Sequence, residues 1–168
     1  INVLSYDGEN EPEVLGTIGA SAAIAISDIP WDGPVASVSI GRIDEKFVIN
    51  PSLEQLESSD LNMVVSGTSD SVVMVEGVSD FISEEDVLSA IQYAHGVIKD
   101  IVAMQNDLVK ECGQDKRVVK EPEVNEDLHS KIDDVMKDDY ISLNDPKNKA
   151  ERYGAIDDYV ADIVSKFE

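Results

Sequence analysis

Apolar and polar positions along the first part of the chain predict a strand, a turn and a helix. Ile1–Tyr6 alternates between apolar and polar side chains, which is typical of a strand, and Asp7–Asn10 predicts a turn. Val14–Ile26 is apolar or small at almost every position. A helix without a polar face is a buried helix, so we expect this one to be covered on all sides. Asn10 and Glu13 have the spacing of a capping box at its start.

Two β-hairpins are predicted to follow. Their strands and turns are Val35–Ile43 with Lys46–Asn50 across Asp44-Glu45, and Leu61–Ser66 with Ser71–Glu76 across Gly67–Asp70. Pro51–Glu57 between them favours a short helix or turn. Met63 and Val65 alternate with more polar neighbours, so one face of that strand should be more buried than the other.

A long amphipathic helix is predicted from about Ser83 to Cys112. Ser83 and Asp86 have capping-box spacing, and Gly113 suits the position after the last turn. The apolar residues recur with helical period, at Val87, Ile91, Ala94, Ile98, Ile101, Val102, Leu108 and Cys112. We expect Cys112 to pack at the end of this stripe as a small apolar residue.

Two further amphipathic helices are predicted after a polar linker that runs from Gly113 through Arg117 towards Pro122. Their apolar positions are Val124, Leu128, Ile132, Val135 and Met136 in one, and Tyr153, Ile156, Val160, Ile163, Val164 and Phe167 in the other. Such stripes need a helical partner, either the long helix or helices outside the chain. The chain opens without Met and ends within a helical pattern, so we expect it to be a piece of a larger protein.

Charge changes which functions are plausible. The 168 residues carry 35 acidic and 13 basic side chains, a formal net charge of −22. Residues 1–112 account for 20 of the acidic and only 4 of the basic ones. Binding of nucleic acid needs clustered Lys and Arg, so the chain alone is a poor nucleic-acid binder. One cysteine and two distant histidines exclude an internal disulfide and argue against a thiolate or histidine metal site.

Each residue or motif that could act in catalysis or ligand binding is explained as well by an ordinary structural role. Asp7, Glu9, Glu11 and Glu13 alternate as calcium ligands do, but an EF-hand would need Gly and Glu where Pro12 and Ile18 stand. The acidic pairs Asp133-Asp134 and Asp138-Asp139 suit a solvated helix face. His95 is expected to be a partly buried structural residue, because no nucleophile motif accompanies it. Gly67–Asp70 lacks the pattern of a phosphate loop and suits a hairpin turn.

Several longer runs resemble a known family. They are Leu4-Ser5-Tyr6-Asp7-Gly8-Glu9-Asn10-Glu11-Pro12-Glu13, Gly19-Ala20-Ser21-Ala22-Ala23, Asn50-Pro51-Ser52, Asp60 to Thr68, Val73-Met74-Val75-Glu76, Lys120 to Asn125 and Glu151-Arg152-Tyr153. In collinear order they resemble the second half of the first ribonuclease-PH-like core of the bacterial polynucleotide phosphorylases, followed by the start of the helical domain. The likeness extends over essentially the whole chain.

The resemblance implies an α+β fold, with a partial ribonuclease-PH-like core made of a mixed sheet and packed helices, then an all-α segment. It implies a half-core at 1–113, a linker at 114–121 and part of a helical domain at 122–168. The intact family enzyme is a cytoplasmic, ring-shaped homotrimer that degrades single-stranded mRNA from the 3′ end with inorganic phosphate, releasing nucleoside diphosphates. It uses Mg²⁺ and can join RNA-degradation complexes, and it is not a membrane protein.

Within that family the resemblance implies that this half-core is catalytically silent. Where the second core of the family grips phosphate with a Gly-Ser-Ser-Ser run, this chain has Asn10-Glu11-Pro12-Glu13. Where that core has a catalytic Asp-x-Asp-Phe-Lys run, this chain keeps Asp60 but has Asn62 and Val64 in place of the second Asp and the Lys. We therefore expect no catalytic, phosphate-binding or metal-binding residue here, no bound cofactor, and a structural role in the trimer and its RNA channel.

Two other functions remain open. The chain could be an acidic protein-interaction module without enzymatic activity. The encoding reading frame would distinguish this function from that of a ribonuclease segment, since a phosphorolytic ribonuclease requires another core downstream. A carboxylate-metal hydrolase is a third possibility, which micromolar binding of magnesium or manganese would support and its absence would exclude.

Overall fold

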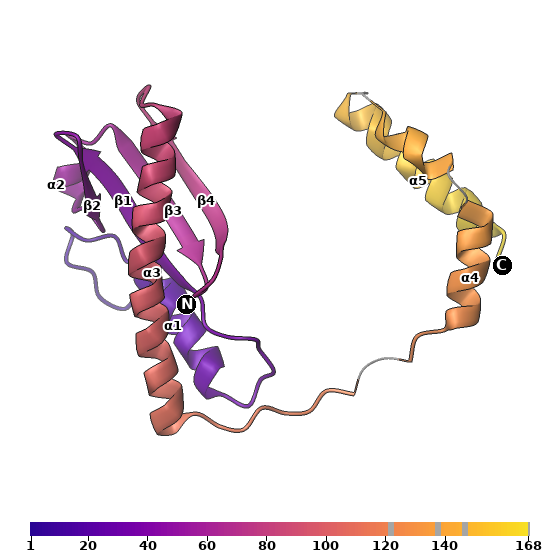
Figure 1. Cartoon of the computed structure of the whole chain (residues 1–168), viewed down its shortest axis with the longest axis horizontal. Helices are drawn as coiled ribbons and strands as arrows, with labels where there is room; N and C mark the ends of the chain where they lie inside the picture. The colour runs from indigo at the N-terminus through magenta and orange to yellow at the C-terminus, as the bar shows by residue number, and fades with distance from the viewer. Residues whose placement is uncertain (121–122, 137–138, 146–147, 168) are drawn as a thin grey trace. The chain divides into compact units, whose positions relative to one another are not determined.

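The computed structural model describes the chain except residues 121–122, 137–138, 146–147 and 168. The chain divides into two compact units, Ile1–Val119 and Lys120–Glu168 (Figure 1). The first unit holds the sheet and its helices, and the second is helical. The predicted α+β class with a helical C-terminal part is therefore confirmed.

A four-stranded sheet forms the centre of the first unit. Its strands are β1 (Ala36–Ile43), β2 (Lys46–Ile49), β3 (Leu61–Gly67) and β4 (Val72–Ser79), in the spatial order β2-β1-β3-β4. Both predicted hairpins are present. The family resemblance led us to expect a mixed sheet, but all three pairings of the described strands are antiparallel. Two of them, β1 with β2 and β3 with β4, are hairpins with short connections, which require antiparallel strands. Asp44 and Glu45 both have left-handed φ angles, 47° and 61°, as a two-residue hairpin turn requires.

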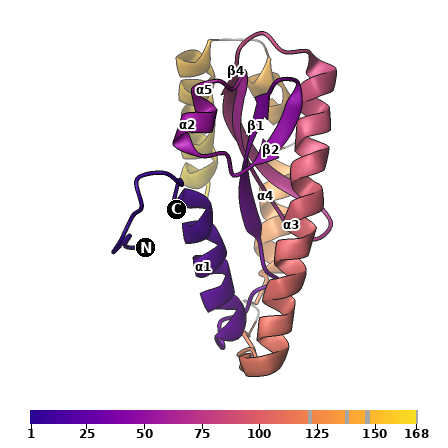
Figure 2. The same ribbon diagram turned by 90° about the vertical axis from the view of Figure 1, so that its left-hand side faces the viewer.

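Helix α3 (Glu84–Cys112) covers one face of this sheet (Figures 1 and 2). Its predicted N-cap is confirmed, since the Ser83 hydroxyl accepts a hydrogen bond from the Asp86 backbone N–H at 3.1 Å. Burial alternates along β3, with Leu61, Met63 and Val65 facing inward as predicted. The buried apolar core comprises Ala36, Val38, Ile40, Leu61, Met63, Val65, Ala90, Ala94, Ile98 and Val102.

The buried stripe of α3 is shorter than the sequence predicts. It ends at Gln105, whereas Leu108 is partly exposed and Cys112 is exposed. The prediction that Cys112 packs as a core residue is therefore wrong. The Cys112 side chain is exposed in the last turn, and its thiol donates to the Leu108 carbonyl at 3.3 Å.

Helix α1 (Glu13–Ile26) lies on the other side of β1 from α3 (Figure 2). Only Val14, Ser21 and Ala25 are buried, and Leu15 is 67% exposed. The prediction of a helix buried on all sides is thus wrong, because a helix packed against a sheet and one neighbouring helix has a free face whatever its composition.

A closed ring of hydrogen bonds joins α1, α3 and the start of β1. The buried Ser21 hydroxyl donates to Gln105 Oε1 at 2.7 Å and accepts from the Val35 N–H at 2.9 Å. The Gln105 amide in turn donates to the Val35 carbonyl at 2.9 Å. Gln105 is only 2% exposed. The ring therefore satisfies a polar side chain that would otherwise be costly to bury.

The N-terminal segment differs from its prediction. Ile1–Tyr6 forms no strand and is exposed, and none of the described strands pairs with it. The turn at Asp7–Asn10 is present, but the capping box is not. Pro12 is the N-cap of α1 without a side-chain cap, and the Asn10 amide donates to Asp7 at 2.7 Å instead.

The second unit contains α4 (Glu126–Met136), a 3₁₀ segment at Asp139–Asn144 and α5 (Lys149–Ser165). The Tyr159 hydroxyl donates to the Met136 carbonyl at 2.9 Å, which joins the two α-helices. Neither helix has a buried residue. Asp133 and Asp134 are exposed as expected, whereas the pair Asp138-Asp139 lies outside the residues whose side chains the structure describes.

The boundary between the units falls between Val119 and Lys120. The predicted linker, 114–121, spans this boundary and extends to residue 121, which is outside the described residues, as is the first residue of the predicted helical domain at 122–168. Among the helices that the structure describes, none has the length and apolar character needed to cross a bilayer.

Candidate functional site

The sheet face opposite α3 carries a mixed polar and apolar surface. Its side chains alternate with the core residues, and the pairing places Ser39 beside Val64 and Val64 beside Glu76 in one row across three strands. In the next row Ser37 and Ser66 share a hydroxyl–hydroxyl hydrogen bond of 2.6 Å. Ser39 Oγ is buried and has no hydrogen-bond partner among the described residues. This face is the floor of the candidate site.

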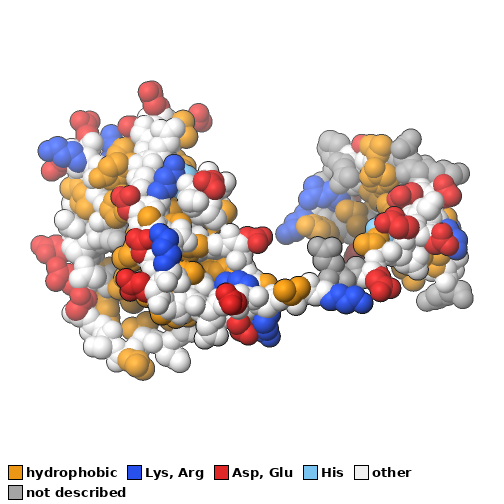
Figure 3. Space-filling view, turned by 60° about the horizontal axis from the view of Figure 1, so that its bottom comes forward, with side chains coloured by type: hydrophobic (Ala, Val, Ile, Leu, Met, Phe, Trp, Pro, Cys, Tyr) orange, Lys and Arg blue, Asp and Glu red, His pale blue; other side chains and the backbone are white. Residues whose placement is uncertain are grey.

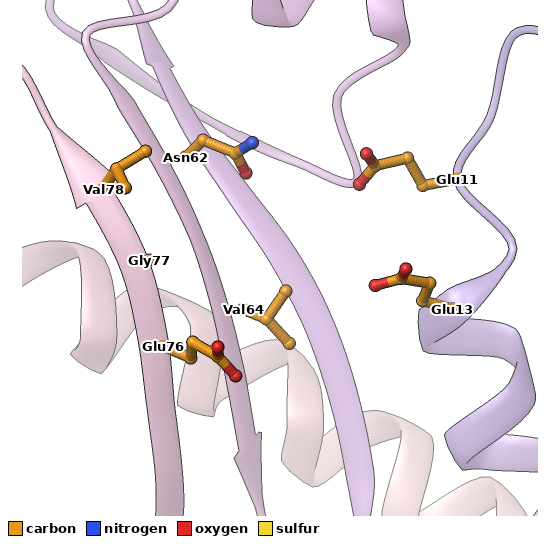
Figure 4. Close-up of a pocket in the computed structure, with 7 residues that line it drawn as sticks. All are labelled: Glu11, Glu13, Asn62, Val64, Glu76, Gly77 and Val78. Atoms are coloured by element: carbon orange, nitrogen blue, oxygen red, sulfur yellow. The ribbon is translucent and has the colours of Figure 1, made fainter.

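Glu11 and Glu13 form the opposite wall. Pro12 initiates α1 without a side-chain cap, so the chain enters the helix with a carboxylate on either side of the proline. Figure 4 shows both carboxylates pointing towards Asn62 and Val64 on β3, with Glu76 on the neighbouring strand β4. The open groove between them has a volume of about 310 Å³ and is lined by Glu11, Glu13, Asn62, Val64, Glu76, Gly77 and Val78.

Gly77 lets the two strands meet closely at this groove. A Cβ atom at this position would lie 2.5 Å from the Asn62 carbonyl oxygen and 2.6 Å from Met63 Cα. Both are backbone atoms, which cannot move aside as a flexible side chain would. The groove also continues over Val14, Thr17, Ser37, Ser66 and Met74 in a second hollow of about 320 Å³.

The groove is unsuited to an anion. Three of its lining residues are glutamates, and none of the lining residues that the structure describes is cationic. A unit negative charge about 4 Å from one carboxylate is repelled by roughly 1–4 kcal/mol at effective dielectric constants of 80 to 20. Figure 3 shows one face of the molecule, on which acidic side chains outnumber the Lys and Arg side chains that lie among them. Among the described residues, no group of three acidic, histidine or cysteine side chains is placed to hold a metal ion.

Four residues that the sequence singled out do come together. Glu11, Glu13, Asn62 and Val64 all line the groove. Glu76 lies there too, although the sequence analysis assigned it no such role. The strand prediction included Glu76, but its place beside Val64 depends on the register between β3 and β4, which no local pattern reveals.

Asp60 lies apart from the groove and is an ion-pair residue. Its Oδ2 contacts Arg42 Nη1, and Arg42 Nη2 lies 3.6 Å from Asp86 Oδ2 at the start of α3. The Arg42 side chain is only 13% exposed. The other oxygen of Asp60 is buried without a described partner. The Arg42–Asp60 pair thus ties β1 to the start of β3, and Arg42 extends the link to α3, which gives Asp60 a structural role.

The remaining candidates have structural positions. His95 is partly buried, as predicted, and its Nε2 lies 3.1 Å from the Thr68 carbonyl in the β3–β4 turn. That turn is the predicted hairpin connection, closed by a hydrogen bond from the Thr68 N–H to the Ser71 carbonyl at 2.9 Å. Neither feature faces the groove.

Asp7 organises the turn before Glu11. Its carboxylate accepts hydrogen bonds from the backbone and side chain of Asn10 and from the Glu9 N–H, at 2.7–2.9 Å. These bonds, with the Asn10 backbone first, favour the charged form and lower the pKa of Asp7 from 3.8 to about 2.

The turn should therefore loosen only in strong acid. Because the pKa of Asp7 is lowered in the folded chain, its contribution is present above about pH 4 and is lost as the pH falls towards 2. A carboxyl-carbon NMR titration should place the midpoint of Asp7 near pH 2, and the signal should be absent from an Asp7→Asn variant. A midpoint close to 3.8, the value for a free aspartate, would contradict these hydrogen bonds.

The chain matches known proteins in two ways. Residues 33–97, which include β1 to β4 and half of α3, match the model of the 3′ exoribonuclease family, domain 2. The chain is also similar to three bacterial polyribonucleotide nucleotidyltransferases. It is 39% identical to those of Geotalea uraniireducens and Bacillus subtilis, and 42% to that of Trichlorobacter lovleyi, in each case over 99% of this chain and 24% of the relative.

These matches confirm the resemblance on which the sequence interpretation rests. Over nearly its whole length the chain is similar to one segment of these polyribonucleotide nucleotidyltransferases. It spans about a quarter of the length of the curated relatives it matches.

Proposed function

We propose that this chain is a segment of a phosphate-dependent 3′-to-5′ exoribonuclease that degrades mRNA to nucleoside diphosphates. The support is the continuous similarity to polyribonucleotide nucleotidyltransferases together with the match of the sheet region to the 3′ exoribonuclease model. Single-stranded RNA and inorganic phosphate are the proposed substrates of the whole enzyme. Its cytoplasmic location and its contacts with other RNA-degradation proteins belong to the same proposal.

Within that enzyme we propose that this half-core does no chemistry. The observation that carries this is the convergence of Glu11, Glu13 and Glu76 on one groove. An attacking phosphate and an RNA backbone are both anions, and carboxylates repel them. Val64 cannot neutralise phosphate charge, and the Asn62 amide is a poor proton carrier and a weak magnesium ligand. The Mg²⁺ that the enzyme uses would therefore bind in another segment.

The role left to this half-core is structural. We propose that it helps to hold the homotrimer together and to shape the RNA channel. The exposed apolar side chains on α1 and β4, among them Leu15, Val75 and Val78, support a surface that is covered in the assembled enzyme.

Activity assays test the proposal directly. We expect the chain alone to release no nucleoside diphosphate from single-stranded RNA and phosphate. In the whole enzyme made from the same reading frame, Asn62→Ala should leave kcat within about twofold, since nothing in the reaction depends on it. Turnover by the chain alone, or a loss of kcat of about a hundredfold in the variant, would show that the groove is catalytic.

The helical unit favours a second candidate, an acidic protein-interaction module. Leu128, Val160 and Val164 are exposed on helices without a buried residue. Sequencing the gene beyond the codon for Glu168 distinguishes the two, since a phosphorolytic enzyme requires a second core downstream.

A further inference from the structure

The chain turns back on itself after α3. Gly113 ends the helix, and the next residues run along the C-terminal end of α1. The Gln114 N–H donates to the Ile26 carbonyl at 2.9 Å, and the Arg117 N–H donates to the Asp28 carbonyl at 2.8 Å. Two helices that are far apart in the sequence are thereby joined at their ends.

Lys116 is the centre of this connection. Its ammonium group donates to three backbone carbonyls, those of Ile24, Ala25 and Ser27, at 2.9, 2.8 and 2.6 Å. The last carbonyls of a helix lack N–H partners within the helix and form the negative end of its dipole. A cation at this end therefore donates hydrogen bonds to the carbonyls and interacts favourably with the dipole. Beside it, Arg117 Nε lies 3.0 Å from Asp28 Oδ2.

These contacts are polar throughout. Gln114–Arg117 contains no apolar side chain, and all four residues are exposed. Nothing in the core depends on the segment, in contrast to the Gln105 ring. Its attachment therefore rests on hydrogen bonds and charge, which water and salt can replace.

We propose that Gln114–Arg117 is a releasable latch, a segment that binds reversibly to the C-terminal end of α1, and that the Lys116 ammonium group supplies three of its hydrogen bonds. When the latch is closed, Val118 is the first residue beyond its contacts with the end of α1. When it is open, Gln114–Arg117 leaves α1 and adds four residues, on the order of 14 Å if extended, to the chain that precedes the helical unit. The latch thus controls the tether between the two units and does not depend on the proposed enzymatic function.

Hydrogen exchange measures the opening. Among the described residues, the Gln114 and Arg117 N–H groups donate to the Ile26 and Asp28 carbonyls, at and just after the end of α1, so their exchange reports release of the latch. In the whole chain at low salt, we expect Lys116→Gln to speed exchange at these two amides by about three- to tenfold. Asp28→Asn should have a smaller effect on the same amides, because it removes only the contact with Arg117.

The matched control is Lys110→Gln. It removes the same charge from another exposed lysine, whose partner is Asp107 on its own helix. It should leave the exchange rates of the Gln114 and Arg117 amides unchanged. As a second readout, trypsin should cut after Arg117 faster in the Lys116→Gln variant than in this control. The latch is disproved if the Gln114 and Arg117 amides exchange at the same rate in the Lys116→Gln and Lys110→Gln variants, or if these amides are unprotected in the unmodified chain.

Discussion

Replacing Gln105 with leucine is expected to lower the free energy of unfolding by about 2–4 kcal/mol. Leucine fills most of the space but neither accepts from the Ser21 hydroxyl nor donates to the Val35 carbonyl. Both groups would stay in the interior without these partners, and each unsatisfied buried group costs about 1–3 kcal/mol. Urea unfolding followed by circular dichroism measures the change.

Two companion variants make this result interpretable. Gln92→Leu alters an exposed glutamine on the same helix and should change stability by less than about 0.5 kcal/mol. Ser21→Ala combined with Gln105→Leu completes a double-mutant cycle, and the two effects should not add, because both residues belong to one ring. Strict additivity would mean that the two side chains act independently.

Replacing Arg42 with methionine is expected to cost about 1–3 kcal/mol, which is less than breaking a fully buried ion pair because both carboxylates are partly exposed. Without the guanidinium, Asp60 and Asp86 face each other as like charges, and Asp60 keeps one buried oxygen without a described partner. Thermal unfolding should show the lower stability directly.

Arg42→Lys separates charge from geometry. Lysine keeps the cation but cannot present two nitrogens in a fixed fork to two carboxylates, so its stability should lie between the other two. If Arg42→Met is as stable as the unmodified chain, the ion pair contributes nothing and the structural explanation of Asp60 fails. Asp60→Asn in the whole enzyme should accordingly affect heat stability more than kcat.

Elements that form from local signals were predicted well from the sequence. The two-residue turn at Asp44-Glu45, the serine cap at Ser83 and the alternation predicted along Leu61–Ser66 each depend on residues close together in the chain. The strand at Ile1–Tyr6 and the full burial of Val14–Ile26 depended on distant partners, and both predictions were wrong. An apolar composition shows that a helix can be buried, but it does not show whether another element packs against each of its faces.

The site shows the same division. Glu11, Glu13, Asn62 and Val64 were found through resemblance to a family pattern, and they do share one groove. Glu76 was missed because its neighbours are set by strand register, and the partner of Asp60 was missed because Arg42 is 18 residues away on another strand. Cross-strand pairing is needed to find either.

The net charge of this chain opposes association through the free edge of β4. No other described strand pairs with its outer side, and Val73, Val75 and Val78 are exposed along it. Such an edge is a template on which a second copy can add. A net charge of −22 keeps copies apart only within the range of its field, about 10 Å at 0.1 M salt and about 3 Å at 1 M. The acidic surface therefore acts as a colloidal stabiliser, and concentrated salt removes it.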